Sequence, residues 1–109
     1  MKPWEIYSWQ APDWPEPHPA VIISEQNRVA MKPKVNVLLC STKQTRRAAA
    51  PTEVILDSTD GLDWPTLCKC DLIYAVEKSF LTNRRGEVTV ERRREIARKV
   101  IQCLAFAGL

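Results

Sequence analysis

The sequence predicts a mainly β fold of the α+β class: a small antiparallel barrel or curled sheet with one C-terminal helix. Several short apolar segments follow one another along the chain, with turn-forming residues between them. No helical pattern separates these segments, so the crossovers that a parallel sheet requires are missing. The one long amphipathic pattern comes last, where a single helix closes the sheet.

Length and composition agree with one folded domain over residues 1–109. The chain has 45% apolar and 27% charged residues, a balance typical of folded globular proteins. No apolar run approaches the roughly 20 residues of a membrane helix, so we expect no membrane association. The opening MKPWEIYSW contains no apolar stretch long enough for a signal peptide. We therefore expect a cytoplasmic protein.

Four strands are expected in the first half of the fold. Residues 4–9 alternate enough for a first strand, in which Glu5 points away from its neighbours. Residues 10–19 are rich in proline, which fixes φ and removes backbone donors, so we expect a stiff loop that carries His18. The next strand covers residues 20–24, followed by a basic loop at 27–34. Residues 35–41 and 52–56 are further strands, and a basic loop at 42–51 joins them.

The second half begins with strong turn signals at residues 57–65. Residues 66–76 predict a strand with a bend near Asp71, and residues 82–87, TNRRGE, predict a tight basic turn. The final helix starts at Thr89 as N-cap, has Glu91 in its first turn, and stops near Gly108. Its expected buried stripe, at spacings of three and four, is Ile96, Ala97, Val100, Cys103, Leu104 and Ala107.

The four cysteines are interpreted as reduced thiols, as expected in the cytoplasm. Cys68 and Cys70 are two residues apart, so a strand would direct both thiols to the same face. Zinc sites usually need a second pair of ligands at short spacing, which the sequence lacks. Buried core thiols are therefore favoured over a metal site, and no cofactor is expected.

Charge is unevenly distributed. Residues 83–109 contain seven Arg or Lys against three Glu, whereas residues 1–82 contain nine against ten. This asymmetry favours a polyanion as partner. The alternative is that the charged helix simply presents a solvated face.

Reactive side chains stand at three predicted strand ends: His18, the Ser41-Thr42 pair, and the segment that contains Lys69 and Asp71. An imidazole, a hydroxyl, an ammonium and a carboxylate are sufficient for acid–base cleavage of a phosphodiester. Structural interpretations stay open for each group. His18 could be a loop residue, Thr42 a turn cap, and Lys69 with Asp71 a surface ion pair.

Six motifs, in order, resemble the PemK/MazF family of toxins from bacterial type II toxin–antitoxin systems. WEIYSW resembles the family's opening strand, and HPAVIIS resembles its Arg-Pro-Ala-Val-Val-(Ile/Leu)-Ser signature. VNVLLCST resembles the strand that ends in Thr-Ser or Thr-Thr, and PTEVIL resembles Pro-Thr-His-Val-Glu-Leu. The block GLDWPTLCKCDLIYAVEKSFL resembles the family's Cys-Asp segment, and the basic turn NRRGEVT leads to the final helix.

The resemblance implies an SH3-like barrel of the PemK/MazF/CcdB type, a homodimer, and a cognate antitoxin as partner. It implies a metal-independent endoribonuclease that cuts single-stranded mRNA, leaving a 2′,3′-cyclic phosphate and a 5′-hydroxyl. Asp71 matches an acidic catalytic position and would be the general base. Lys69 and Thr42 would stabilise the phosphorane, and Lys69 or His18 would protonate the leaving oxygen. Glu5 matches a residue implicated in RNA contact.

Charge alone, rather than the resemblance, suggests that Arg46 and Arg47 hold RNA phosphates. The chain departs from the family at three positions, where His18 replaces an arginine, Leu72 a glutamine and Tyr74 an arginine. These departures favour the alternative of a catalytically degenerate binding module without nuclease activity. A gyrase-poisoning toxin is a further alternative, but the basic outer face of residues 91–99 does not resemble the apolar end that such a contact would need.

Overall fold

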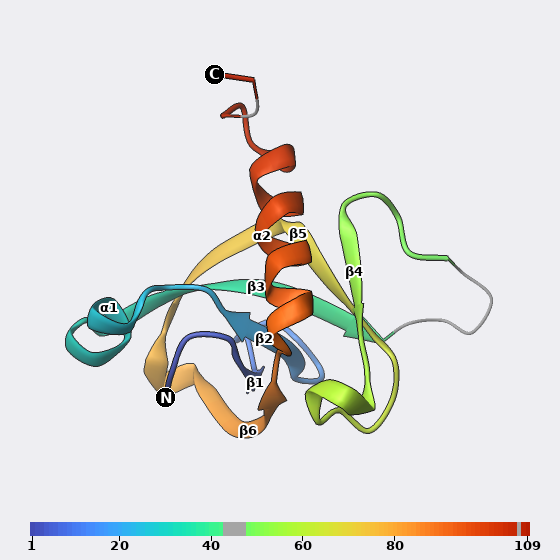
Figure 1. Cartoon of the computed structure of the whole chain (residues 1–109). Coiled ribbons are helices and arrows are strands. Elements are labelled where there is room, and N and C mark those ends of the chain that lie inside the picture. Colours follow the sequence, from blue (N-terminus) through green and yellow to red (C-terminus); the bar gives the residue numbers. More distant parts are fainter. Residues whose placement is uncertain (43–47, 107) are drawn as a thin grey trace.

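The computed structural model describes residues 1–42, 48–106 and 108–109. Within these residues the chain forms six strands and two α-helices, with two short 3-10 turns at 58–60 and 78–80 (Figure 1). The elements are β1 (Glu5–Trp9), β2 (His18–Ile22), α1 (Gln26–Met31), β3 (Lys34–Thr42), β4 (Glu53–Leu56), β5 (Thr66–Glu77), β6 (Leu81–Glu87) and α2 (Val90–Cys103).

All six strands belong to one antiparallel sheet with the order β4-β5-β3-β2-β1-β6. The central position of β3 confirms the prediction that its near-continuous apolar run is interior to the sheet. The sheet is strongly curled, but within the described residues β4 and β6 remain its two separate edges, so it is not closed. This small α+β architecture agrees with the fold class that the sequence predicts.

Two apolar clusters cover the two faces of the sheet, because side chains along β3 alternate between them. Leu38 and Cys40 belong to the first cluster, against which Ile96 of α2 packs. Val35 and Val37 belong to the second cluster, which Val29 of α1 joins. We call these the α2 face and the α1 face. Figure 1 shows α2 lying across the sheet and continuing beyond it.

The predicted bend near Asp71 is a large irregularity of β5. Leu38 of β3 pairs with Ile73, but Cys40, only two residues further, pairs with Cys68. The four residues 69–72 of β5 therefore face the single residue Leu39 of β3, which makes this stretch a bulge. The bulge also reverses the alternation of β5, because Cys68 lies in the cluster of the α2 face and Val76 in that of the α1 face.

Two predicted loops are in fact regular structure. Residues 27–34 were expected to be a loop, but α1 occupies most of them, with its N-terminus capped by the Glu25 carboxylate, which accepts from the Arg28 amide at 2.8 Å. Residues 82–87 were expected to be a tight turn but belong to β6. Asn83, at φ 52°, is skipped where Ser8 pairs with Thr82 and Tyr7 with Arg84. Asparagine tolerates this left-handed conformation, which is also common in turns. Asn83 therefore made the segment look like a turn, although it occupies a bulge within a strand.

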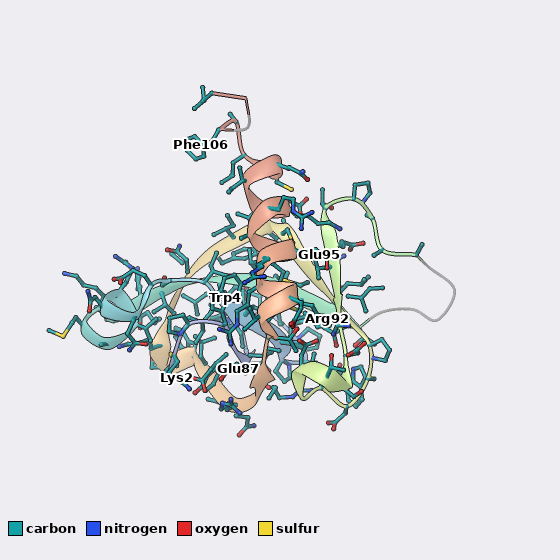
Figure 2. The ribbon with its side chains drawn as sticks, viewed as in Figure 1. Lys2, Trp4, Glu87, Arg92, Glu95 and Phe106 are labelled. Carbon is teal, nitrogen blue, oxygen red and sulfur yellow. The ribbon has the colours of Figure 1, made fainter. Side chains whose placement is uncertain are left out.

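The predicted helix α2 is present, with Thr89 as N-cap residue, but the cap is made by another residue. The Thr89 side chain makes no capping bond, and the Asp60 carboxylate instead accepts from the Thr89 amide at 3.0 Å. Asp60 is buried and also pairs with Arg92, which points toward this turn from the first part of α2 (Figure 2). A negative charge at this helix end also suits the helix dipole.

The predicted stripe of α2 is buried only at its N-terminal half. Ile96 is fully buried and Val100 packs against the same cluster, whereas Ala97 and Leu104 are exposed. Ala107 lies outside the described residues. The helix ends at Cys103, earlier than expected, and the following segment with Phe106 projects away from the sheet (Figure 2). None of the helices in the described part has the length and apolar character needed to cross a membrane.

Cys40, Cys68 and Cys70 are fully buried in the cluster of the α2 face, as the sequence predicts for core thiols. A hydrogen bond with Cys68, together with burial, raises the pKa of Cys70 far above its ordinary value. All four cysteines are free thiols. Among the described residues, no group of three or more Cys, His, Asp or Glu side chains is arranged to hold a metal ion.

Candidate functional site

His18 is the first residue of β2 rather than part of a loop. Pro19 follows it inside the strand and pairs with Ser8, which corrects the expectation that the proline-rich segment extends to residue 19. His18 pairs with Trp9 of β1, and its ring lies 4.7 Å from that of Trp14, in an edge-on arrangement. The half-buried imidazole is thus fixed by a strand on one side and by an indole on the other.

The end of β3 lies beside His18. Ala20–Leu39 is the last pair of β2 with β3, and His18 and Ser41 each lie two residues beyond it, at the same end of these antiparallel strands. Ser41 shares the α1 face with Leu39 and His18. By alternation Thr42 belongs to the other face, at the strand end, where it is exposed and pairs with Thr66. The resemblance to the family points to Thr42, because this residue falls on the family's threonine beside the phosphate.

Lys69 is paired with a carboxylate that the sequence analysis did not consider. Glu53 of β4 lies opposite Lys69 in the register, and the two side chains form a short ion pair. Glu53 is 4% exposed and also accepts from the Ala50 amide at 2.8 Å. The sequence did contain a sign of this pair, because Glu53 is a charged residue at the start of the otherwise apolar strand EVIL. A carboxylate buried there requires a partner.

Asp71 lies in the bulge of β5 and is exposed. Burial and, after it, the charge of Asp71 raise the pKa of Cys103 near the end of α2. Lys69, in contrast, faces Glu53 on β4. Simple alternation along β5 would place Lys69 and Asp71 on one face, but a bulge interrupts regular alternation.

Glu5 is buried, at 4% exposure, and does not present its carboxylate directly to solvent. It accepts from the Lys2 amide at 2.5 Å and forms a short ion pair with Arg84 of β6. Burial raises the pKa of Glu5, but the hydrogen bonds from Arg84 and Lys2 outweigh it, so the net pKa is lowered. Any contact of Glu5 with a ligand would be made through the half-exposed Arg84.

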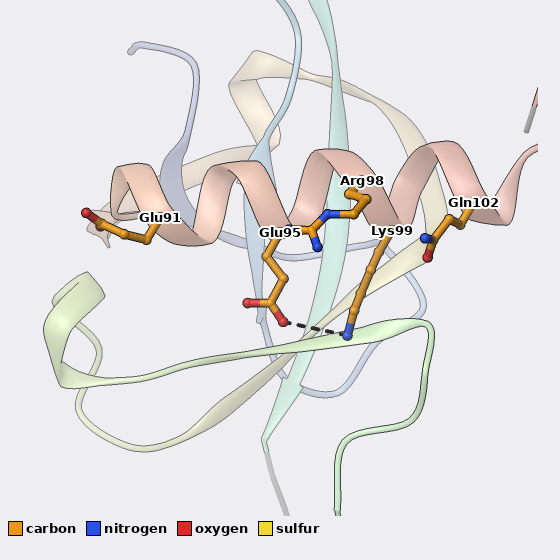
Figure 3. A pocket seen from close by; sticks show the side chains of 5 residues that line it. All are labelled: Glu91, Glu95, Arg98, Lys99 and Gln102. Carbon is orange, nitrogen blue, oxygen red and sulfur yellow. Dashed lines mark ion pairs between the residues drawn. The ribbon is translucent and has the colours of Figure 1, made fainter.

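The two arginines expected to hold phosphates, Arg46 and Arg47, lie outside the described residues. A hollow of about 310 Å³ is lined by side chains of α2 alone, including the ion pair of Glu95 and Lys99 at 3.7 Å (Figure 3). It contains none of the predicted catalytic residues. A second hollow of about 250 Å³ is apolar and lies between α2 and the segment around Trp4.

The sheet thus brings His18, Ser41 and Thr42 to one end of β2 and β3, with the Lys69–Glu53 pair on the adjoining β5 and β4. Asp71 follows Lys69 along β5, in the bulge, and Glu5 is paired with Arg84. Chemically, the group at the strand ends offers an imidazole, two hydroxyls and an ammonium, which suit binding and proton transfer at an anionic centre.

Comparison with solved structures defines the class of protein to which this fold belongs. An endoribonuclease from a mycobacterial species, in complex with its cognate antitoxin, superposes with a TM-score of 0.83 at 21% identity, covering 100% of this chain and 99% of the other. The MazF-mt6 toxin of Mycobacterium tuberculosis gives 0.75 at 19% identity, with 91% and 94% covered. MazF in the MazE–MazF structure of Deinococcus radiodurans gives 0.76 at 14% identity, with 98% and 97% covered. The fold is that of small bacterial toxins.

The family model for PemK-like, MazF-like toxins of type II toxin–antitoxin systems matches residues 2–104. The chain therefore belongs to this family, which confirms the resemblance found in the sequence. Its members are generally endoribonucleases. The comparison with curated proteins found no match.

Proposed function

We propose that this protein is a toxin that cuts single-stranded mRNA without a metal ion, leaving a 2′,3′-cyclic phosphate and a 5′-hydroxyl. The family match supports the class of activity. The observation that carries the proposal is the arrangement of His18 and the Ser41-Thr42 pair at the same end of adjacent strands, with Lys69 on the next strand. A scissile phosphate placed there would meet donors from three strands.

In the proposed reaction, the ribose 2′-oxygen attacks the adjacent phosphorus while the bond from phosphorus to the 5′-oxygen breaks. Asp71, which is exposed, accepts the proton of the 2′-hydroxyl. His18 donates a proton to the leaving 5′-oxygen, and Lys69 stabilises the negative charge on the phosphorane. A hydroxyl of the Ser41-Thr42 pair assists Lys69: Thr42 matches the family's threonine, and Ser41 shares the α1 face with His18. No proton is lost overall, because one is taken from the nucleophile and one is given to the leaving group.

Glu53 has a positioning role in this scheme. Its carboxylate fixes the Lys69 ammonium and lowers the net positive charge of the pair. Because Glu53 is buried, we expect it to position Lys69 without contacting the RNA itself. Asp71 and Glu53 are thus the two carboxylates whose contributions an experiment must separate.

The test is incubation of purified protein with a long single-stranded RNA in EDTA. We expect discrete fragments with cyclic-phosphate ends, and at least a hundredfold slower cleavage for Asp71→Asn, His18→Ala or Lys69→Met. Asp63→Asn, which changes an exposed carboxylate in a distant turn, is the matched control and should cut normally. Normal cleavage by Asp71→Asn, with loss in Glu53→Gln, would transfer the base role to Glu53. RNA left intact by the wild type would refute the nuclease.

A non-cleaving RNA-binding module is the second candidate. It is favoured by the loss of two polar family residues at Leu72 and Tyr74, since Tyr74 is used here to pack against Trp9 with ring centroids 5.1 Å apart. RNA that stays intact but is retarded on a native gel would establish this alternative.

We further propose that the protein works in the cytoplasm as a homodimer and is inhibited by a cognate antitoxin. Leu72 and Ile73 of β5 are exposed apolar side chains, each 37% accessible, which a second protein chain could cover. Light scattering of the purified protein would test the dimer. Growth arrest on expression, relieved by the product of the adjacent gene, would test the antitoxin.

A further inference from the structure

We propose that Trp14, which contacts His18 and shares the neighbour Trp9 with Tyr74, is a stacking subsite for one unpaired nucleobase. The inference rests on the RNA-directed function proposed above and adds to it a binding residue that the reaction scheme does not use. It also assigns a purpose to the proline-rich segment before β2.

The subsite is an aromatic cluster built around Trp9. The Trp14 ring lies 4.7 Å from that of Trp9, and Tyr74 lies 5.1 Å from Trp9. His18 meets the edge of the cluster at 4.7 Å from Trp14. Trp9 is buried, whereas Trp14 and His18 are half-buried and Tyr74 is exposed. Part of the aromatic surface of the cluster therefore reaches solvent.

The loop holds Trp14 ready for a ligand. The Trp14 amide donates to the Ala11 carbonyl at 3.1 Å, and the Gln10 side chain donates to the Trp14 carbonyl at 2.5 Å. Pro12 and Pro15 further restrict the backbone on either side. A ring that is already fixed costs little conformational entropy on binding, so most of the stacking energy would appear as affinity.

The position of the cluster favours a nucleobase over an apolar protein segment. His18 connects it directly to the proposed catalytic end of β2 and β3, so a base on Trp14 would keep its own phosphate near the imidazole. The imidazole and the Tyr74 hydroxyl add polar groups that can meet base edges. Net charge of +3 also favours a polyanion. Stacking of a base on an aromatic ring is worth about 1–3 kcal/mol and tolerates any base.

The experiment measures binding apart from cleavage, using a 2′-O-methyl oligouridylate, which lacks the nucleophilic hydroxyl, and an abasic oligomer of equal length. We expect Trp14→Leu to bind the oligouridylate about tenfold more weakly than the wild type. Trp14→Phe should stay within about threefold, since it keeps a ring. Trp64→Leu is the matched control, because Trp64 is exposed in a turn outside the cluster.

On the abasic oligomer, the wild type and Trp14→Leu should bind equally, because no base is left to stack. Equal weakening of Trp14→Leu on both oligomers would overturn the proposal, as would an unchanged affinity for the oligouridylate or no binding of it by the wild type. Cleavage of ordinary RNA is followed separately. Loss of that activity with base-dependent binding intact would refute the nuclease but not the stacking subsite.

Discussion

Arg92 donates two hydrogen bonds to the Asp57 carboxylate, from Nη1 to Oδ1 at 2.8 Å and from Nη2 to Oδ2 at 3.1 Å. The same guanidinium pairs with Asp60, whose other carboxylate oxygen accepts from the Thr89 amide. One arginine thus fixes the 3-10 turn at 58–60 to the start of α2. Two-point pairing of this kind is stronger and more directional than a single ion pair.

Replacement of Arg92 by Met should lower the free energy of unfolding by about 2–3 kcal/mol, because the buried Asp60 carboxylate would lose its cation. The effect is smaller than for a fully buried pair, since a quarter of the Arg92 side chain is accessible. Urea denaturation measures it. Arg94→Met, at an exposed position of the same helix, should change stability by less than about 0.5 kcal/mol. Equal effects of the two variants would contradict this assignment.

Stability should fall in acid through Asp57. Its hydrogen bonds with Arg92 and Thr59 hold the pKa of Asp57 well below the ordinary value of 3.8. A depressed folded-state pKa contributes stability that is present above the unfolded value and is lost as the pH falls below it. Urea midpoints should therefore be level from pH 7 to about pH 5 and decline below about pH 4. Asp57→Asn should show a shallower decline, and an identical pH profile would count against this role.

Replacement of Gly86 by Ala should destabilise the protein by about 3 kcal/mol or more. A Cβ at Gly86 would overlap the Asp60 carbonyl and approach the Cα of Gly61, and both obstacles are backbone. The strand and the turn would have to separate. Thermal unfolding would reveal the loss. A Gly86→Ala protein as stable as the wild type would show that the contact is not close.

Glu53→Gln should separate RNA binding from cleavage. Removal of this negative charge leaves Lys69 unneutralised, so affinity for a single-stranded oligonucleotide should rise about threefold at low salt, with a steeper salt dependence. Turnover should fall about tenfold because Lys69 loses its fixed position. Glu95→Gln, an exposed carboxylate on α2, provides the control. Unchanged affinity together with unchanged turnover would exclude a positioning role.

Glu5 should matter for stability first and for RNA only through Arg84. Glu5→Gln should lower the free energy of unfolding by about 2 kcal/mol, because a buried charged partner of Arg84 is lost. Arg84→Gln should reduce oligonucleotide affinity more than Glu5→Gln does if Arg84 meets the phosphates. Filter binding and denaturation on both variants decide this. A larger affinity loss for Glu5→Gln would indicate direct contact.

Strands were predictable where an apolar run is long, as in β3. The final helix was predictable because its apolar residues recur at spacings of three and four and because Thr89 marks its start. The bend near Asp71 was also anticipated. In contrast, α1 has six residues and buries only Val29, so it leaves almost no periodic signal. The edge strand β6 was obscured by Asn83, whose left-handed conformation serves a bulge instead of a turn.

The candidate site was predictable in its residue types but not in its pairings. Local alternation predicted that Lys69 and Asp71 share a face of the strand, whereas the register of β5 with β4 places Glu53 opposite Lys69. Such a partner lies far away in the sequence and depends on which strands become neighbours. The burial of Glu5 has the same origin, because Arg84 reaches it from β6. Local patterns therefore specify which groups are available, and the sheet register decides what they touch.

Because of the bulge in β5, the number of residues in the segment 69–72 decides which face of the sheet the following side chains point to. One residue fewer in this segment would exchange inside for outside along one half of the strand, taking either Cys68 and Cys70 or Tyr74 and Val76 from their present clusters. Deletions here should therefore be far less tolerated than substitutions at the same positions. The number of residues in this segment, more than their identity, allows one strand to contribute side chains to the apolar clusters on both faces of the sheet.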